Sequence, residues 1–264
     1  MPLTLSGIWT DIMMIREKSP LIHSITNFAG INTTTNALLA IGAFPIMAHA
    51  EQEIEDMIAV ADALAIDIGA LNDHEVKSMF KAAESAKKRD IPIVIDPVGA
   101  GISSYRVRTV HELVTAASPT IIRGNPLDIM TLEGKKPEIK KPDADTVMGS
   151  ALKAAGVLSR RNDGMVICIS GEIDYVVRGD DVMKVRHGHP LTARVAGMGC
   201  TATALCAAFA SVNDDYLIAT ARAMAVMGIA GEIAAEASAG GGSMQVNFLD
   251  TLYRLSKVDI KRFL

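Results

Sequence analysis

The sequence predicts a single α/β domain over residues 1–264, with a mostly parallel central sheet and helices on both faces. Short, continuously apolar runs alternate with longer amphipathic segments, and such runs are typical of parallel strands that are buried on both sides. The hydrophobic content of 49% is sufficient for one large core. The candidate strands are residues 63–69, 91–97, 120–125 and 165–171.

The segments between these strands predict crossover helices. Residues 72–89 place Val76, Met79, Phe80 and Ala83 on one face of a helix, and residues 103–117 form a second amphipathic pattern. The lysine- and proline-rich segment 134–143 predicts an exposed loop within the domain rather than a boundary between domains.

Two further segments complete the expected domain. Residues 173–177 and 182–186, joined by a short polar stretch, predict a hairpin at the edge of the sheet. Residues 195–212 are uncharged, but Ala, Thr and Ser dominate the segment and two glycines lie near its start. This composition favours a buried core helix over a membrane span.

The composition argues against several classes of function. A net charge of -4 and 4% aromatic residues provide neither a basic groove nor stacking platforms for nucleic acid. Cys168, Cys200 and Cys206 are an odd number and form no Cys-x-x-Cys pair, which indicates a reducing compartment. The N-terminal segment lacks the pattern of a secretion signal. We therefore expect a cytoplasmic protein that binds a small molecule and neither a membrane nor nucleic acid.

The sequence Gly197-Met198-Gly199-Cys200-Thr201, followed by a run of small residues, is the most informative stretch. Glycines at the start of a helix leave backbone N–H groups free to bind an anion, and the helix N-terminus lowers the pKa of a thiol. The stretch lacks both the P-loop ending and the dinucleotide-binding spacing. Taken alone, it is more typical of a tightly packed turn in which Cys200 is a small buried hydrophobe.

Polar residues follow the candidate strands at their carboxyl ends, where parallel sheets bind ligands. They are Asp67, Asp96, Arg123, Asn125 and Ser170. A phosphotransferase could use such a set: Asp96 and Asp128 would organise magnesium, Arg123 would neutralise phosphate, and the Gly199–Cys200 turn would serve as an anion hole.

Five motifs then make a resemblance specific. They are residues 20–28 (PLIHSITNF), 32–48 (which include NTTTNALLAIGA and PIMA), 96–100 (DPVGA), 123–125 (RGN) and 196–200 (AGMGC). In this order they resemble the hydroxyethylthiazole kinase family over nearly the whole chain. The resemblance implies a ribokinase-like fold without a separate lid domain. It also implies ATP-dependent, Mg²⁺-assisted phosphorylation of the primary alcohol of 4-methyl-5-(2-hydroxyethyl)thiazole in thiamine salvage, by a homotrimer with active sites between subunits.

The resemblance also implies roles for individual residues. The thiazole pocket would be formed by Asn27, Met47, Gly69 and Gly197, with Met47 donated by a neighbouring subunit. ATP would contact Arg123, Asn125 and Ser170, and Mg²⁺ would be held by Asp96 and Asp128. Gly199 and Cys200 would donate backbone N–H groups to the transferring phosphoryl group, and Cys200 stands where members of the broader fold usually carry an aspartate.

The chain departs from the family pattern at two places. Asp128 replaces a glutamate, and Asp67-Ile68-Gly69-Ala70 replaces Asn-Ile-Gly-Thr, which adds a potential charge near the pocket and removes a hydroxyl.

Three alternatives stay open from the sequence. One is a kinase of a related heteroaromatic alcohol such as hydroxymethylpyrimidine, and another is a nucleotide-sensing regulator that keeps the fold without turnover. The third is a cysteine-dependent hydrolase that uses Cys200 with His23, His49 or His187 as the base.

Overall fold

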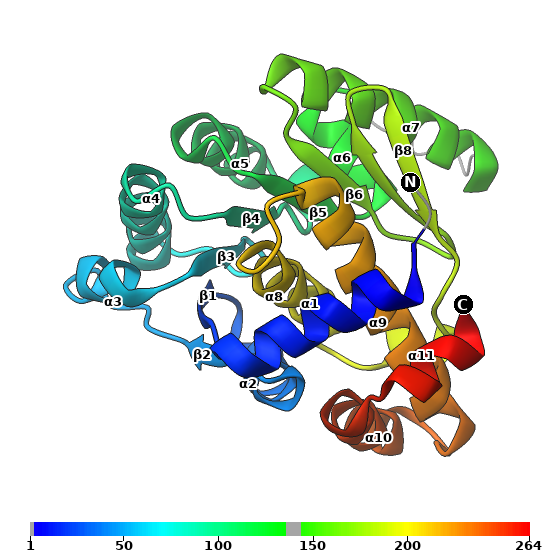
Figure 1. The fold of residues 1–264 in the computed structure, drawn as a ribbon. Helices are drawn as coiled ribbons and strands as arrows, with labels where there is room; N and C mark the ends of the chain where they lie inside the picture. The colour runs from blue at the N-terminus through cyan, green and yellow to red at the C-terminus, as the bar shows by residue number, and fades with distance from the viewer. Residues whose placement is uncertain (1–2, 136–143) are drawn as a thin grey trace.

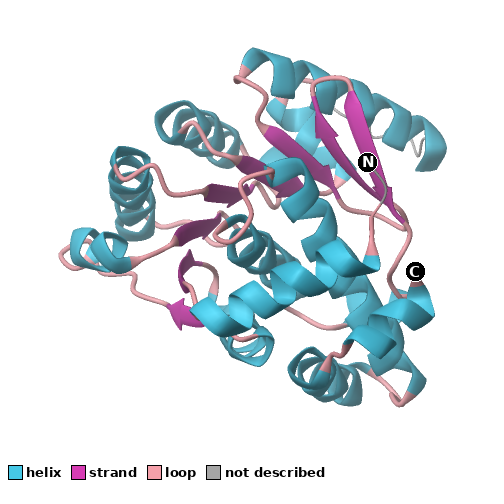
Figure 2. Ribbon diagram, in the orientation of Figure 1, coloured by secondary structure: helices cyan, strands magenta, loops and turns pink. Residues whose placement is uncertain are grey.

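The computed structural model describes residues 3–135 and 144–264, and within them one sheet of eight strands forms the centre of the molecule (Figures 1 and 2). The strand order is β2-β1-β3-β4-β5-β6-β7-β8. Strands β1 to β6 pair in parallel, and β7 and β8 form an antiparallel hairpin at one edge. The bounds are β1 Leu21–Ile25, β2 Phe44–Ile46, β3 Ala63–Asp67, β4 Ile93–Asp96, β5 Ile121–Gly124, β6 Val166–Ile169, β7 Asp174–Arg178 and β8 Asp181–Val185.

This topology confirms the predicted α/β class, the four predicted core strands and the edge hairpin, with strand ends that differ by at most two residues. Sequence reasoning missed β1 and β2. His23 and Ser24 interrupt the apolar run of β1, and β2 is only three residues long and contains Pro45. Neither strand therefore carries the continuous apolar signal that marks the others.

Helices cover both faces of the sheet, as predicted. One face carries α1 (Leu5–Lys18), α2 (Phe28–Ile41), α8 (Met198–Ala210), α9 (Tyr216–Glu236), α10 (Gly241–Arg254) and α11 (Lys257–Phe263). The other carries α3 (Ile54–Val60), α4 (Asp73–Lys88), α5 (Ser104–Ala117), α6 (Pro126–Leu132) and α7 (Ala144–Arg161). Alternate residues of the central strands enter the two cores: in β3, Ala63 and Ala65 join the first, and Leu64 and Ile66 the second.

The two predicted crossover helices are confirmed as α4 and α5, and capping side chains set where each begins. Asn72 accepts the N–H groups of His74 and Glu75, and Ser103 accepts that of Arg106. On α4 the buried stripe includes Met79 and Ala83. Of the predicted loop 134–143, residues 134 and 135 are exposed and residues 136–143 lie outside the described residues.

Helix α8 confirms the predicted core helix within residues 195–212. Its 13 residues contact β1, β3 and β4, and Figure 1 shows the helix over the middle of the sheet. Within the described residues one helix, α9, is long and apolar enough to cross a membrane, but 78% of its apolar window is buried inside the protein. Helix α9 packs against α8 and is thus a core helix of the domain.

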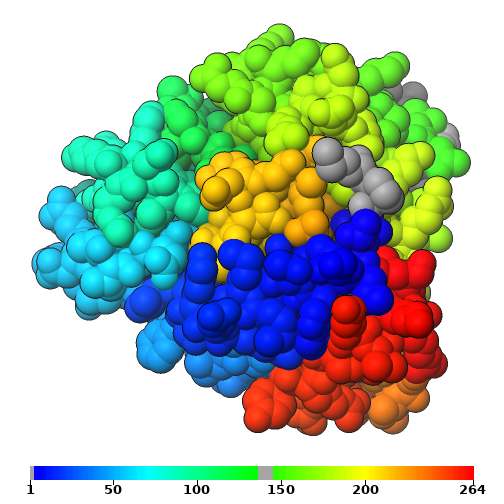
Figure 3. Space-filling model, in the orientation of Figure 1, coloured from blue at the N-terminus to red at the C-terminus, as the bar shows by residue number. Residues whose placement is uncertain are grey.

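A buried ion pair fastens the N-terminal helix to this core. Arg222 on α9 donates to Asp11 on α1 at 2.9 Å, and Asp11 is only 2% exposed. Helix α1 also contacts α11, so segments from the two ends of the chain lie side by side, as Figure 3 shows on one surface of the molecule.

Candidate functional site

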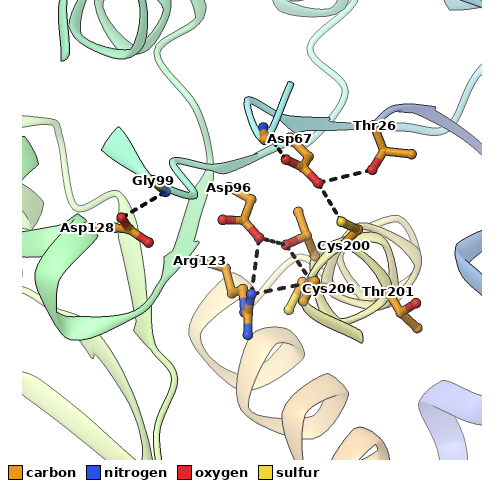
Figure 4. Close-up of polar contacts among 12 residues, drawn as sticks. Thr26, Asp67, Asp96, Gly99, Arg123, Asp128, Cys200, Thr201 and Cys206 are labelled. Carbon is orange, nitrogen blue, oxygen red and sulfur yellow. Dashed lines mark hydrogen bonds and ion pairs between the residues drawn. The ribbon is translucent and has the colours of Figure 1, made fainter. Parts of the chain in front are cut away.

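The polar strand ends predicted from the sequence meet at one edge of the sheet. Asp67 is the last residue of β3 and Asp96 the last of β4, and the two are register partners. Helix α8 begins beside them, so that its first turn faces both carboxylates (Figure 4). The site therefore lies at the carboxyl ends of the central strands.

Asp67 is the most densely contacted carboxylate at this edge. Its Oδ2 atom accepts hydrogen bonds from Thr26 Oγ1 at 3.1 Å, Asn27 Nδ2 at 3.0 Å and Cys200 Sγ at 2.5 Å. Its Oδ1 atom accepts the backbone N–H of Gly69 at 2.6 Å. Because the side chain is 3% exposed, these donors replace water. Asp67 thus connects β1, β3 and α8.

Asp96 makes a second connection to α8. Its Oδ2 atom accepts Arg123 Nη1 at 3.1 Å and Thr203 Oγ1 at 3.0 Å. Arg123, on β5, also donates to the carbonyl of Gly199 at 3.4 Å. Burial raises the pKa of Asp96 to about 6, while the charge of Arg123 acts in the opposite direction. Arg123 therefore lies between β4 and the start of α8 and neutralises the Asp96 carboxylate.

The backbone at the start of α8 is shaped by glycine. Gly197 caps the helix with a φ of 83°, and the first intrahelical bond runs from Thr201 N–H to the Gly197 carbonyl at 2.9 Å. The N–H groups of Met198, Gly199 and Cys200 therefore precede the helix's own hydrogen-bond ladder. This arrangement is suited to an anion, as the sequence predicted.

Asp128 approaches the site from α6. Asn125 caps that helix by accepting the N–H groups of Leu127 and Asp128 at 2.9 and 3.0 Å, and Asp128 Oδ1 accepts the N–H of Gly99 at 3.0 Å. Asp128 Oδ2 is buried without a hydrogen-bond partner, and burial raises the pKa of this carboxyl. Asn125 thus orients the turn that presents Asp128.

The remaining predicted residues differ in how close they lie to this cluster. Gly69 adjoins it, since a Cβ there would come within 2.7 Å of Asp67 Oδ1. The N–H of Ser170 donates to the carbonyl of Gly124 at 2.9 Å, and its hydroxyl is buried beside Cys168. Met47 follows β2, is partly buried against the core, and is separated from β3 by β1. Within one chain, Met47 is therefore not part of the polar cluster.

The expectation of a lowered thiol pKa at Cys200 is wrong. Burial, followed by the negative charge of Asp67, raises the pKa of Cys200 to about 12. The thiol thus keeps its proton and donates a hydrogen bond to Asp67, despite the helix N-terminus. Cys168, Cys200 and Cys206 are all free thiols.

Three contributors were not found from the sequence. Thr26 and Thr203 supply hydroxyls to the two buried carboxylates, and the hydroxyls within the small-residue run of α8 were the available signal for Thr203. Arg106 on α5 donates to the carbonyls of Ile68, Gly69 and Val98 at 2.9, 2.7 and 3.1 Å. It fixes the loops that follow β3 and β4, and nothing in its sequence context marks that role.

Comparisons with known proteins identify the family of this chain. Residues 12–258 match the model of the hydroxyethylthiazole kinase family. A hydroxyethylthiazole kinase of Syntrophus aciditrophicus is 49% identical over 99% of this chain and 97% of the relative. The chain belongs to the hydroxyethylthiazole kinase family.

Solved structures support the fold of this hydroxyethylthiazole kinase family member. A hydroxyethylthiazole kinase structure from Pyrococcus horikoshii superposes with a TM-score of 0.88 at 39% identity, covering 97% of this chain and 96% of that one. A ribokinase-like superfamily protein from Enterococcus faecalis, at 13% identity, has a TM-score of 0.64 and covers 92% of this chain and 87% of that one. The predicted ribokinase-like fold is thus confirmed.

The turn at Gly197 provides a test of the close approach between α8 and α2. A Cβ at Gly197 would lie 2.9 Å from Gly30 Cα, whereas Gly179, with a φ of 60°, has no atom within 4 Å of its Cβ position. We expect Gly179→Ala to lower the free energy of unfolding by the about 1–2 kcal/mol of a left-handed backbone, and Gly197→Ala by distinctly more. Urea unfolding measures both, and equal losses would contradict a steric role for Gly197.

Proposed function

We propose that this protein transfers the γ-phosphoryl group of ATP to the primary alcohol of 4-methyl-5-(2-hydroxyethyl)thiazole. The observation that carries the proposal is that Arg123, the buried carboxylates of Asp96 and Asp128, and the first turn of α8 lie together at one edge of the sheet. Phosphoryl transfer needs positioning and positive charge around the equatorial oxygens more than covalent chemistry. Family membership supports the choice of the thiazole alcohol as acceptor.

The donor set fits a magnesium ion bound together with nucleotide phosphates. Asp128 Oδ2 is a buried carboxylate oxygen without a hydrogen-bond partner. Asp96 lies close enough to Asp128 for the charge of Asp128 to raise the pKa of Asp96. Among the described residues no group of three His, Cys, Asp or Glu side chains could hold a metal. Proteins often bind Mg²⁺ through one or two carboxylates, with phosphates and water completing the shell.

In the proposed mechanism, Asp96 and Asp128 would hold Mg²⁺, which neutralises charge on the polyphosphate. Arg123 contacts the phosphates of ATP, and Asn125 and Ser170 line the nucleotide side of the site. The N–H groups of Gly199 and Cys200 stabilise the transferring phosphoryl group. The substrate hydroxyl approaches the γ-phosphorus in line from the side of Asn27, Gly69 and Gly197.

We also infer that the active unit is a homotrimer in which Met47 of a neighbouring subunit completes the thiazole pocket. Strand β2, which precedes Met47, is the outermost parallel strand of the sheet. Its first residue, Phe44, is 56% exposed. An exposed apolar side chain at an open strand edge favours association there.

The geometry disfavours the cysteine-dependent hydrolase. In the described part of the chain, the side-chain partners of Cys200 are Thr26, Asn27 and Asp67, not a histidine. His23 is hydrogen-bonded to the carbonyl of Ala48, and His187 lies near Glu232. A thiol with a pKa of about 12 and, in the described residues, no histidine beside it is a poor nucleophile.

An assay of phosphoryl transfer across heteroaromatic alcohols tests the proposed function. With ATP and Mg²⁺, we expect the hydroxyethylthiazole alcohol to be phosphorylated with a kcat/KM at least about tenfold above that of the hydroxymethylpyrimidine alcohol, since complementary pocket contacts are worth a few kcal/mol. Chelation of Mg²⁺ should abolish transfer. Preference for the pyrimidine would favour the related kinase, and nucleotide binding without product would favour a regulator.

Subunit complementation tests the shared site. Met47→Asp should block the thiazole pocket, and the isosteric Asp128→Asn should weaken metal binding, so each variant alone should be nearly inactive. Mixed by unfolding and refolding, the two should form trimers in which about a quarter of the sites combine an intact Met47 with an intact Asp128. Activity that recovers toward that fraction, with trimers seen by sedimentation, is expected. Mixtures no more active than the separate variants would contradict a site between subunits.

A further inference from the structure

Asp67 is the acceptor in every hydrogen bond that its carboxylate makes among the described residues. All four of its partners, Thr26 Oγ1, Asn27 Nδ2, Cys200 Sγ and the Gly69 N–H, donate to it. A carboxylate can accept from every one of them, whereas an amide would turn an NH₂ group toward at least one donor.

The same pattern fixes the proton of Cys200. The thiol has one hydrogen, which it donates in a hydrogen bond to Asp67 Oδ2, with 2.5 Å between the sulfur and the oxygen. Burial and the Asp67 charge raise the pKa of Cys200, so the thiol does not ionise ahead of the reaction. The sulfur is therefore left as a hydrogen-bond acceptor toward any other group, and Asn27 Nδ2 already uses it in this way at 3.4 Å.

Among the carboxylates of the site, Asp67 is the one that is hydrogen-bonded to Cys200. Asp96 is paired with the Arg123 cation, and Asp128 lies on the other side of the site beside Gly99. Within the described residues Asp67 has no cationic partner and is 3% exposed. An uncompensated buried carboxylate next to a thiol at the start of α8 is well placed for proton transfer.

We propose that Asp67 is the final acceptor of the substrate's hydroxyl proton and that Cys200 relays it, an inference that rests on the proposed function. As the hydroxyl oxygen bonds to the γ-phosphorus, the bond from that phosphorus to the bridging oxygen of ATP breaks and its electron pair leaves with ADP. The hydroxyl proton passes to Cys200 Sγ while the original thiol proton passes to Asp67 Oδ2. After product release, Asp67 returns the proton to solvent. No oxidant or reductant is needed.

The relay explains how a thiol of high pKa can serve at this position. Cys200 never carries a negative charge beside the polyphosphate, because it gains one proton as it loses another. The charge that a base must carry stays on Asp67, which is behind the thiol as seen from the start of α8 (Figure 4).

Asp67→Asn is the direct test, with Asp62→Asn as the matched control. Asp62 directly precedes the first residue of β3, at the opposite end of the strand from Asp67. Its side chain is exposed and accepts the N–H of Leu21 at 2.8 Å. Single-turnover phosphoryl transfer is followed by rapid quench with Mg²⁺, ATP and the thiazole alcohol. We expect Asp67→Asn to slow transfer by at least about 100-fold, the lower end of general-base effects, with little change in the KM of either substrate. Asp62→Asn should leave the rate unchanged.

Two further readouts separate a relay from a structural role. The rate of transfer is measured in mixtures of H₂O and D₂O and plotted against the deuterium fraction. Because a relay moves two protons, the plot for the unmodified protein should be curved, whereas the plot for Asp67→Asn should be linear. Cys200→Ala should also remove the relay, so the double variant should be no slower than the slower single variant.

These outcomes distinguish failure of the proton relay from failure of the proposed kinase function. The thermal unfolding curve shows whether Asp67→Asn is folded. If the unmodified protein phosphorylates the thiazole alcohol and the folded Asp67→Asn variant does so at a similar rate, the relay is wrong and the kinase function stands. Additive losses in the double variant would also overturn the relay. If the unmodified protein does not phosphorylate the thiazole alcohol, the proposed function itself fails.

Discussion

Two buried carboxylates at the ends of neighbouring strands set the position of helix α8, and the rest of the site depends on that position. Asp67 and Asp96 are 3% and 2% exposed and draw donors from the same helix, Cys200 and Thr203. A buried charge without donors would cost several kcal/mol, so the first turn of α8 is held where these side chains can reach the strand ends. The free N–H groups of that turn are thereby aimed at the edge of the sheet.

Close packing makes this attachment possible. Helix α8 is built mainly of small residues and packs against α2 and α9, and the α2 contact includes the approach of Gly197 to Gly30. Larger side chains would hold the helix away from β3 and β4 and break both carboxylate contacts. Arg123 completes the arrangement because one guanidinium contacts Asp96 and the Gly199 carbonyl at once.

The sequence allowed much of the fold to be predicted, since strands such as β4 and helices such as α4 carry strong periodic signals. It predicted that Asp96, Arg123 and Gly199 lie together, because strand ends meet at one edge. It could not give the thiol pKa of Cys200, which depends on a contact between residues 133 positions apart. Thr26 and Arg106 were missed for the same reason: a single hydroxyl or guanidinium gains its role only from tertiary placement.

The central claim is that the carboxylate-anchored turn of α8 receives the transferring phosphoryl group. A crystal structure with a non-hydrolysable ATP analogue, Mg²⁺ and the thiazole alcohol tests it most directly. We expect that structure to show the γ-phosphate bound to the N–H groups of Gly199 and Cys200, the metal bound to Asp128, and the substrate hydroxyl beside Cys200 Sγ. A nucleotide bound with its γ-phosphate away from this turn, or a substrate hydroxyl on the side of the site remote from Asp67, would contradict it.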